Sequence, residues 1–276
     1  MGADKAIIGA NSQLGRMLRM QYSGQQDIRW FSRSGPEYAW EVAHGADSLR
    51  RGLGDIGLVL CLAGATPGGD GDFSLNTAVA EAVMKAAEPG SRVFLASSLA
   101  VYSGAIGHSE SDIVVPSGAY GRSKLEMEQR AAKIAKVRGV HLVCLRFGNV
   151  VGADLLFRNV RAGRTIEIDE FPNGTTPKRS YLDPEFMASG LQTLFALAKR
   201  GITLPATLNF AADPPLEMGD LMEAAGVPFT RRAAASGASA EVSMDMTRLK
   251  ALDSGFTQLR DARTAIRAWR RVCGAS

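Results

Sequence analysis

The chain has 276 residues, of which 46% are hydrophobic and 22% charged, and its formal net charge is +4. These proportions exclude a disordered, collagen-like or coiled-coil chain. No apolar run approaches the ~20 residues of a membrane-spanning helix, and the N-terminus lacks the basic start and cleavage site of a signal peptide. The length fits one large α/β domain, alone or with a smaller appendage.

The charged residues, histidines and cysteines favour neither a nucleic-acid surface nor a metal site. The basic residues are scattered rather than clustered, which gives nucleic-acid binding little support. His44, His108 and His141 lie far apart in the sequence, without metal-ligand spacing. Three cysteines cannot build a disulfide framework, so we expect reduced thiols in a cytoplasmic protein.

Short apolar runs alternate with helical patterns through the first half of the chain. The expected strands cover residues 6–8, 28–31, 58–63, 92–96 and 140–145, and the expected helices cover residues 13–22, 73–87 and 120–137. The run 58–63 is apolar throughout, as a strand covered on both faces should be. Repeated strand–helix alternation predicts an α/β fold, a Rossmann-like doubly wound parallel sheet.

After Gly152 the pattern loosens. We expect a loop over 167–178, a helix over 184–199, a strand over 208–210, a helix over 216–225, a flexible loop over 231–240 and a last helix over 259–272. This change predicts two parts. A dinucleotide-binding Rossmann domain would span residues 1–152, with 179–200 packing back onto it, and a smaller mixed substrate-binding region would span residues 153–276.

A glycine-containing turn separates the first expected strand from the first helix. Backbone N–H groups of such a turn can approach a pyrophosphate at the helix N-terminus, which favours dinucleotide binding over a plain turn. Ser12 stands where the spacing calls for a middle glycine, and its hydroxyl can donate a hydrogen bond to phosphate. The expected cofactor contacts here are Gly9, Asn11, Ser12, Gln13, Leu14 and Gly15.

The end of the second expected strand bears on which dinucleotide binds. In NAD-binding proteins that strand normally ends in an acid that holds the ribose 2′-hydroxyl. Here the strand runs into Ser32, Arg33 and Ser34, without an acid, and a guanidinium matches the geometry of a 2′-phosphate. We therefore expect Ser32 and Arg33 at the cofactor and NADP in preference to NAD. The alternative is that Arg33 is a solvated loop residue.

An acid–base pair opens the long helix. Tyr120 and Lys124 are four residues apart and share a helix face. An ammonium near a phenol lowers the pKa of the phenol, which makes tyrosine a usable acid and base. Ser98, at the end of the preceding strand, is placed to hydrogen-bond a substrate oxygen. The alternative, a pair on the surface, is less favoured because the serine and the glycine turn accompany it.

Taken in order, these motifs resemble those of the extended short-chain dehydrogenase/reductases, and among them the NAD(P)-dependent nucleotide-sugar epimerase/dehydratase family. The resemblance also rests on the runs 96–102, 145–152, 179–183 and 245–249, on Glu110 and Pro116 before Tyr120, and on Gly255 and Phe256. It spans nearly the whole chain. It is specific for fold and cofactor, and less so for substrate.

The resemblance implies a role for each matching residue. Tyr120 would be the general acid/base, Lys124 would hold the nicotinamide ribose and tune Tyr120, and Ser98 would orient the reacting carbonyl or hydroxyl. The other implied positions are Leu62, Ala63 and Gly64 along the cofactor, Asp47 at the adenine or capping a helix, Asn76 as a structural residue, and Asn149 and Arg179 at the diphosphate of the nucleotide sugar.

Departures from the family's pattern narrow the reaction. Leu99 and Ala100 stand where the 4,6-dehydratase branch carries an Asp–Glu pair, so dehydration is disfavoured. Hydride transfer at a carbinol or ketone remains, as epimerisation or as net reduction or oxidation. Ala153 and Asp154 replace the usual proline after Gly152, so the substrate loop differs.

Two alternatives to a nucleotide-sugar enzyme stay open. One is a carbonyl reductase or dehydrogenase of a non-sugar substrate, and the other is a non-catalytic sensor that binds the cofactor on the same fold. The segments 73–87 and 120–137 resemble helices that pair across a two-fold axis in the family, so we expect a homodimer.

Overall fold

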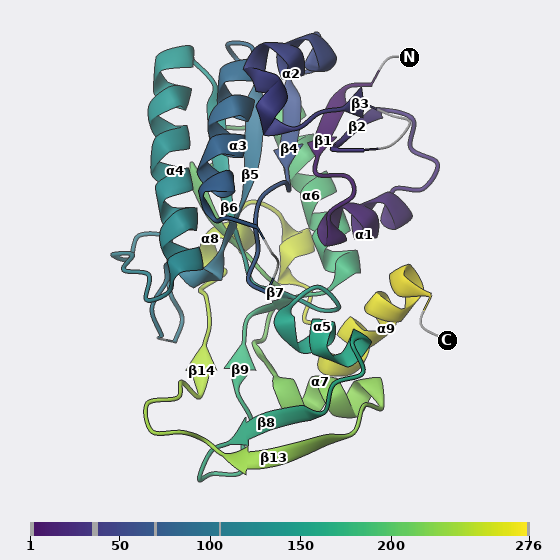
Figure 1. Cartoon of the computed structure of the whole chain (residues 1–276), viewed down its shortest axis with the longest axis vertical. Helices are drawn as coiled ribbons and strands as arrows, with labels where there is room; N and C mark the ends of the chain where they lie inside the picture. Colours follow the sequence, from purple (N-terminus) through teal and green to yellow (C-terminus); the bar gives the residue numbers. More distant parts are fainter. Residues whose placement is uncertain (1–2, 35–37, 69–70, 105, 275–276) are drawn as a thin grey trace. The chain divides into compact units, whose positions relative to one another are not determined.

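Strands between residues 5 and 210 form a seven-stranded sheet in the order β11-β6-β5-β4-β1-β2-β3 (Figure 1). Its strands are β1 (Lys5–Ile8), β2 (Ile28–Ser32), β3 (Tyr38–Ala39), β4 (Leu58–Cys61), β5 (Arg92–Ser98), β6 (His141–Phe147) and β11 (Thr207–Phe210). The neighbours β1–β2, β1–β4, β2–β3 and β4–β5 pair in parallel. The expected Rossmann-like α/β fold is confirmed.

This computed structural model describes residues 3–34, 38–68, 71–104 and 106–274, apart from the side chain of Cys273. The chain forms two units. The first holds Met1–Val101, Val114–Arg146 and Leu194–Leu208, and the second holds Tyr102–Ile113, Phe147–Thr193 and Asn209–Ser276. The units are thus interleaved along the chain rather than divided at residue 152. Of the segment expected to pack back onto the first part, only its end, from Leu194, belongs to the first unit.

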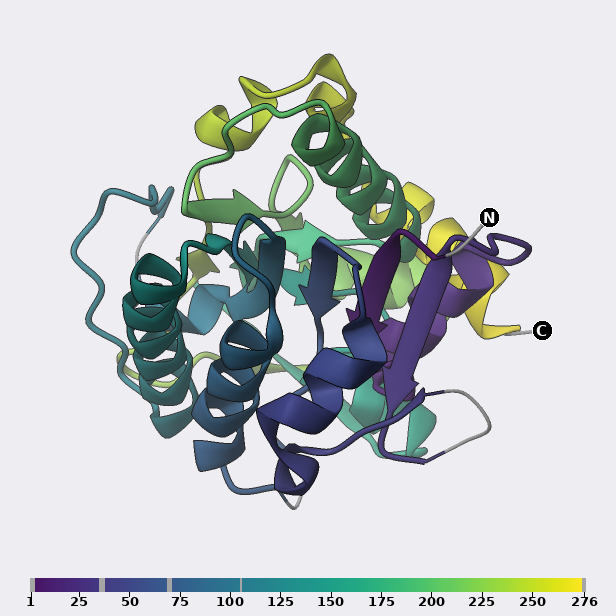
Figure 2. The same cartoon turned by 90° about the horizontal axis from the view of Figure 1, so that it is seen from above.

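Both faces of the first unit's sheet are covered, because side chains of a strand point alternately to its two sides. Ile8, Val59 and Leu95 lie in one apolar cluster with side chains of α2 (Gly45–Leu53), α3 (Ser74–Ala86) and α4 (Ala119–Arg138). Figure 2 shows these three helices along one face. On the other face, Phe94 meets Phe195 near the end of α6 (Pro184–Lys199), with ring centres 5.4 Å apart. Helix α1 (Gln13–Gln21) follows β1.

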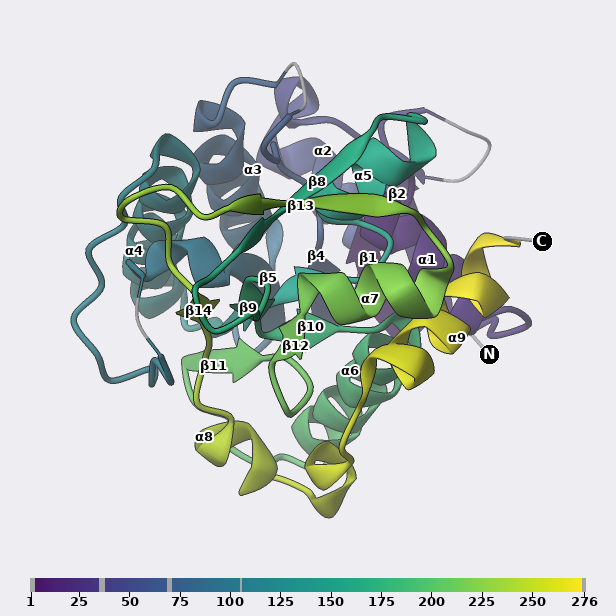
Figure 3. The same ribbon diagram turned by 90° about the horizontal axis from the view of Figure 1, so that it is seen from below.

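The second unit is built from short strands and helices (Figure 3). Its elements are β7 (Asn149–Val150), α5 (Leu155–Arg161), β8 (Ile166–Glu170), β9 (Lys178–Arg179), β10 (Tyr181–Leu182), β12 (Leu216–Glu217), α7 (Met218–Ala225), β13 (Phe229–Ala233), β14 (Glu241–Val242), α8 (Thr247–Lys250) and α9 (Ala262–Cys273). β7 pairs with β10, β8 with β13, and β9 with β12 and β14.

The strands and helices expected in the first half are found with their ends shifted by at most two residues. Two loop expectations in the second half are wrong in part. The expected loop 167–178 begins inside β8, and the expected loop 231–240 begins inside β13. These strands pair with each other, and Arg231 and Arg232 contact Glu170 and Asp169 across the pair. The sequence of β13, with two adjacent arginines, lacks the apolar alternation that predicts a strand, whereas β8 does alternate Ile166 and Ile168 with charged residues, a signal that the loop expectation overlooked.

Cys61 and Cys144 are free and buried, whereas the side chain of Cys273 lies outside the described residues. Among the helices within the described ranges, none is both long and apolar enough to cross a membrane.

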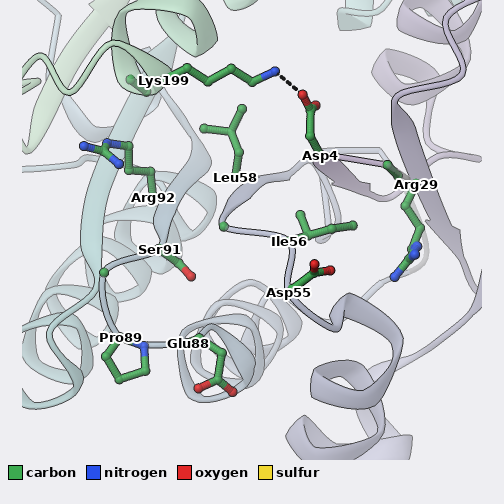
Figure 4. A pocket seen from close by; sticks show the side chains of 14 residues that line it. Asp4, Arg29, Asp55, Ile56, Leu58, Glu88, Pro89, Ser91, Arg92 and Lys199 are labelled. Atoms are coloured by element: carbon green, nitrogen blue, oxygen red, sulfur yellow. Dashed lines mark hydrogen bonds and ion pairs between the residues drawn. The ribbon is translucent and has the colours of Figure 1, made fainter. Parts of the chain in front are cut away.

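A cavity of about 820 Å³ lies at the amino-terminal edge of the first unit's sheet (Figure 4). It is lined by residues at or just before the starts of the strands, among them Asp4, Leu58 and Arg92. Lys199 bridges to Asp4 there. Because the strands are parallel, this edge is opposite the one that carries Gly9 and Ser98. The expected site residues of the first unit are therefore not those of this cavity.

Candidate active site

The turn after β1 brings backbone segments closer together than any side chain would permit. Gly9 has a φ of +96°, and a Cβ atom there would lie 2.7 Å from the amide nitrogen of Ala63. A Cβ atom on Gly15 would lie 2.3 Å from the carbonyl oxygen of Gly9. Glycine is therefore required at both positions, and α1 begins directly against the turn.

Ser12 is the N-cap of α1. Its side-chain oxygen accepts a hydrogen bond of 3.0 Å from the Gly15 amide, which leaves the hydroxyl proton available to donate. The first turn of α1 carries no acidic residue, so the positive end of the helix dipole is not neutralised there. Gln13 and Leu14, the first residues of the helix, are half-buried. This local structure suits an anion.

The end of β2 is tied to the same turn. The side-chain amide of Asn11 donates to the carbonyl oxygen of Ser34 at 2.8 Å, and the hydroxyl of Ser32 donates to that oxygen at 2.6 Å. Ser32 is buried, whereas Arg33 is exposed. Asp47 lies in the first turn of α2, where its carboxylate accepts a 2.6 Å hydrogen bond from Arg50 of the same helix.

The segment after β4 is shaped by a buried asparagine. The side-chain oxygen of Asn76 accepts from the Ala65 amide, and its nitrogen donates to the Ser123 hydroxyl, both at 3.0 Å. Gly64 has a φ of +152°, and a Cβ atom there would lie 2.3 Å from the Asn76 side-chain oxygen and 3.7 Å from Lys124 Nζ. Asn76 therefore links this segment to α4.

The other two expected residues of this segment differ in exposure. Leu62 is buried, and its amide donates to the Ile8 carbonyl at 2.8 Å, whereas Ala63 is half-buried. Gly64 is exposed. The segment thus leaves the sheet next to the Gly9 turn and becomes accessible at Gly64.

Tyr120 lies at the start of α4, and Ser98, at the end of β5, is one of the groups that act on its phenol. Burial raises the pKa of Tyr120, and the hydrogen bond with Ser98 opposes that rise. The Tyr120 ring also packs against Phe73, with ring centres 5.6 Å apart. The next residue, Gly121, permits this placement, because a Cβ atom there would lie 2.0 Å from the Ala100 carbonyl oxygen.

Lys124 is buried one helical turn after Tyr120. Its Nζ donates to the Ala96 carbonyl oxygen at 2.9 Å and lies 5.9 Å from the centre of the Tyr120 ring. Burial lowers the pKa of Lys124 to about 8. The sequence led us to expect that Lys124 lowers the pKa of Tyr120. In the structure, the pKa of Tyr120 is raised overall, and the hydrogen bond that lowers it comes from Ser98.

Asn149 and Arg179 lie in the second unit. The Asn149 side-chain nitrogen is 3.5 Å from Asp154 Oδ2. The Arg179 guanidinium donates to the carbonyl oxygens of Lys178 at 2.7 Å and Ser239 at 3.2 Å. Burial lowers the pKa of Arg179. The structure thus holds the Arg179 guanidinium on backbone carbonyls.

Sequence reasoning gave Asp154 no role beyond a departure from the family's pattern. It is the N-cap of α5, accepting from the Phe157 amide at 3.0 Å, and it accepts from the Tyr181 hydroxyl at 3.1 Å. Burial raises the pKa of Asp154 to about 6. An Asp directly before a helix is a recognisable cap signal, but its burial and its contact with Tyr181 are not visible in the sequence.

Comparison with known proteins supports the expectations drawn from the motifs. Residues 69–198 match the model of the NAD dependent epimerase/dehydratase family. A search of curated proteins gave no match to the chain. Many solved structures match its fold.

Three of these structures cover nearly all of the chain. UDP-N-acetylglucosamine 4-epimerase from Bacillus cereus is 20% identical with a TM-score of 0.71, covering 99% of this chain and 99% of its own. UDP-glucuronic acid 4-epimerase from Bacillus cereus, in complex with UDP-glucuronic acid and NAD, is 15% identical with a TM-score of 0.77 and covers 100% of both chains. MoeE5, in complex with UDP-glucuronic acid and NAD, is 23% identical with a TM-score of 0.75, covering 98% of this chain and 99% of its own.

At these identities the structural matches show the fold, and the family match covers the segment that holds Ser98, Tyr120 and Lys124. The family match over residues 69–198 agrees with the recognition made from the motifs, and the chain has the fold of solved epimerases of the extended short-chain dehydrogenase/reductase type.

Proposed function

We propose that the protein transfers a hydride at a carbinol or ketone carbon of a nucleotide-activated sugar, and that the net reaction is epimerisation. The observation that carries this proposal is the position of Lys124, which is buried one helical turn after Tyr120, has its Nζ 5.9 Å from the centre of the Tyr120 ring, and faces Gly64. Solved structures of the same fold are sugar-nucleotide 4-epimerases, which supports a sugar nucleotide as the substrate class.

The residues at this edge of the sheet fit a nicotinamide dinucleotide. The backbone at Gly9, Gly15 and Gly64 leaves no room for a Cβ atom, as expected where a cofactor and neighbouring segments approach closely. Ser12 and the N-terminus of α1 would hold the pyrophosphate, and Lys124 would hold the nicotinamide ribose. When bound, the nicotinamide supplies a carbon that accepts a hydride and can give it back.

The chain's own residues would move the proton. Tyr120 would have to ionise against the rise of its pKa by burial; its oxygen would then accept the proton of the substrate carbinol as the carbonyl forms, and the same phenol would return it when the alcohol forms again. The Ser98 hydroxyl bonds the reacting oxygen and keeps it beside the Tyr120 oxygen. Leu99 and Ala100, which follow Ser98, have no titratable group, so water elimination has no acid–base pair at these positions.

The substrate side and the choice of dinucleotide belong to the same proposal. Asn149 and Arg179 would contact the diphosphate, for which Arg179 would exchange its bonds to backbone carbonyls for bonds to phosphate. Arg33, exposed after β2, favours NADP, whereas the solved structures named above contain NAD. The homodimer and the cytoplasmic location stay predictions.

The decisive experiment combines product identity with cofactor balance. The purified protein is incubated with NAD or NADP and with UDP-glucuronic acid, UDP-glucose or UDP-N-acetylglucosamine, and the sugar is identified by NMR while the absorbance of reduced cofactor is followed. Epimerisation predicts a new sugar epimer without a steady change in absorbance. A steady change would instead show net oxidation or reduction. Cofactor binding without turnover of any of the three sugars would contradict the proposed substrate class.

A further inference from the structure

The first unit contains a buried ion pair, one member of which lies one helical turn after Lys124 on α4. Glu128 of α4 and Arg146 of β6 face each other with N–O distances of 3.1 and 2.8 Å, and their side chains are 8% and 5% exposed. The hydroxyl of Ser97 donates to the same Glu128 carboxylate at 2.5 Å. The carboxylate therefore has partners on both neighbouring strands, β5 and β6.

The position of this pair connects it to the catalytic constellation. Glu128 follows Lys124 by one helical turn, so both side chains leave the same face of α4. Lys124 donates to the Ala96 carbonyl, and Glu128 accepts from Ser97. Two successive turns of α4 thus hold the end of β5, and the next residue of that strand is Ser98.

We propose that Glu128, held by Arg146, is a positioning residue that fixes the end of β5 against α4, keeping Lys124 in place and Ser98 within reach of Tyr120. The expectation that loss of Glu128 slows turnover rests on the proposed function. The expectation that Glu128 affects the position and pKa of Lys124 does not. Stability alone gives a weak reason for such a pair, because apolar residues of similar volume often replace a buried ion pair without loss.

Charge adds a second link between Glu128 and Lys124. The groups that face Lys124 are Cys61 from β4, Cys144 from β6, and Glu128 and Tyr120 from its own helix. Burial raises the pKa of both thiols, to about 11 for Cys61 and further for Cys144, and raises that of Tyr120. Glu128 therefore supplies the negative charge near Lys124 at neutral pH, and it opposes the lowering of the Lys124 pKa by burial.

The main test replaces the pair by apolar residues in the double variant E128M/R146M, which avoids an unpaired buried charge. The titration of Lys124 is followed by NMR of protein labelled with [ε-13C]lysine, and its signal is assigned with Lys124→Arg. We expect the Lys124 midpoint to fall, because Glu128 raises the pKa of Lys124 and Arg146 is not among the groups that act on it. NAD affinity and thermal stability are measured on the same samples.

A second variant keeps the test decisive if the double variant does not fold. Ser97→Ala removes only the hydroxyl that Glu128 holds, and we expect NAD binding and sugar turnover to weaken about tenfold, against about 100-fold for the double variant. The matched control is Glu126→Gln, which removes an exposed carboxylate of α4 that pairs with Arg130. It should behave like the wild type.

The readouts separate this proposal from the proposed function. A wild-type Lys124 midpoint and wild-type NAD affinity in folded E128M/R146M would overturn the positioning role, and so would unchanged NAD affinity in Ser97→Ala if the double variant does not fold. If no sugar is turned over by the wild-type protein, the substrate proposal fails, but the Lys124 titration still decides the role of Glu128.

Discussion

The two edges of the central sheet differ in how closely their segments pack: one edge has a cavity, and the other has close contacts at glycine residues. The amino-terminal edge has a cavity of about 820 Å³ lined by charged residues of both signs, such as Asp4, Arg92 and Lys199. At the carboxyl-terminal edge a Cβ atom on Gly9 would meet the backbone of Ala63, and one on Gly64 would meet the side chain of Asn76, so both positions require glycine. The proposed site therefore lies at the edge with close contacts and buried polar groups, and not at the edge with the cavity.

The largest expected effect tests the carboxyl-terminal edge directly. Tyr120→Phe removes the group that accepts and returns the substrate proton, so we expect turnover to fall by about 10²–10⁴-fold while NAD affinity changes little. Turnover and cofactor binding are measured separately. Tyr38→Phe, at an exposed tyrosine of β3, is the control, and undiminished turnover in Tyr120→Phe would remove Tyr120 from the mechanism.

A glycine at each edge gives the next comparison. Gly64→Ala forces a side chain against Asn76 at a φ of +152°, whereas a Cβ atom on Gly57, in the lining of the cavity, meets nothing within 4 Å. We expect Gly64→Ala to weaken NAD binding about 100-fold, since strained backbone costs about 1–3 kcal/mol and the cofactor path narrows. Gly57→Ala should leave it unchanged. Equal affinities in titration calorimetry would contradict the assignment of Gly64 to the cofactor.

A lysine at each edge sharpens the comparison through pH. Burial lowers the pKa of Lys124 to about 8 in the folded protein. The unfolded chain therefore binds this proton more tightly than the folded protein does. Below pH 8 the buried ammonium lowers the free energy of unfolding. Lys124→Met should raise the unfolding free energy at pH 7 by about 1–3 kcal/mol, an advantage that disappears as pH rises from 8 toward 10.5.

The matching change at the other edge should act in the opposite direction. Lys199 is half-exposed and pairs with Asp4, so Lys199→Met should lower stability by no more than about 1 kcal/mol. Urea unfolding at pH 7 and pH 9.5 measures both variants. If Lys124→Met is less stable than the wild type at pH 7, the contacts of the ammonium, such as its bond to the Ala96 carbonyl, outweigh the cost of burying its charge.

The smallest effect concerns the choice of dinucleotide. Arg33→Ala should weaken NADP binding about tenfold, in line with about 1.5 kcal/mol for a hydrogen bond to a charged group, and leave NAD binding nearly unchanged. Arg92→Ala, at the cavity edge, should affect neither. Fluorescence titration with both dinucleotides provides the measurement, and an equal loss for NAD and NADP in Arg33→Ala would remove the basis for the NADP preference.

Local sequence was sufficient for the elements that bury a regular apolar face. The strands of the first unit and α1, α3, α4 and α6 are visible as periodic runs, whereas α2 (Gly45–Leu53) was missed because its buried apolar residues are essentially Leu49 and Leu53. β13 was missed because Arg231 and Arg232 interrupt any apolar alternation, and β8 was missed although Ile166 and Ile168 alternate with charged residues.

In the candidate site, too, some features are visible in the local sequence and others depend on the tertiary fold. Ser98, Tyr120 and Lys124 could be placed together from helix spacing and strand ends. The tight contact of Gly121 with Ala100, and the pairing of Glu128 with Arg146, depend on how α4 packs on the sheet. No spacing in the sequence encodes these contacts, because they join segments whose separation is set by the tertiary fold.

The Ser12 hydroxyl, in the turn after β1, caps α1 and can also donate to an anion, so few other residues can replace it. The Ser12 oxygen accepts a hydrogen bond from the Gly15 amide, so its own proton can be donated to another group. Exchange for glycine would restore the usual loop spacing at a penalty of only a few tenths of a kcal/mol to the helix, yet a donor to the bound anion would vanish. Ser12→Ala would lose both the hydrogen bond from the Gly15 amide and the donor to the anion. Ser12→Thr would keep both and add one methyl group.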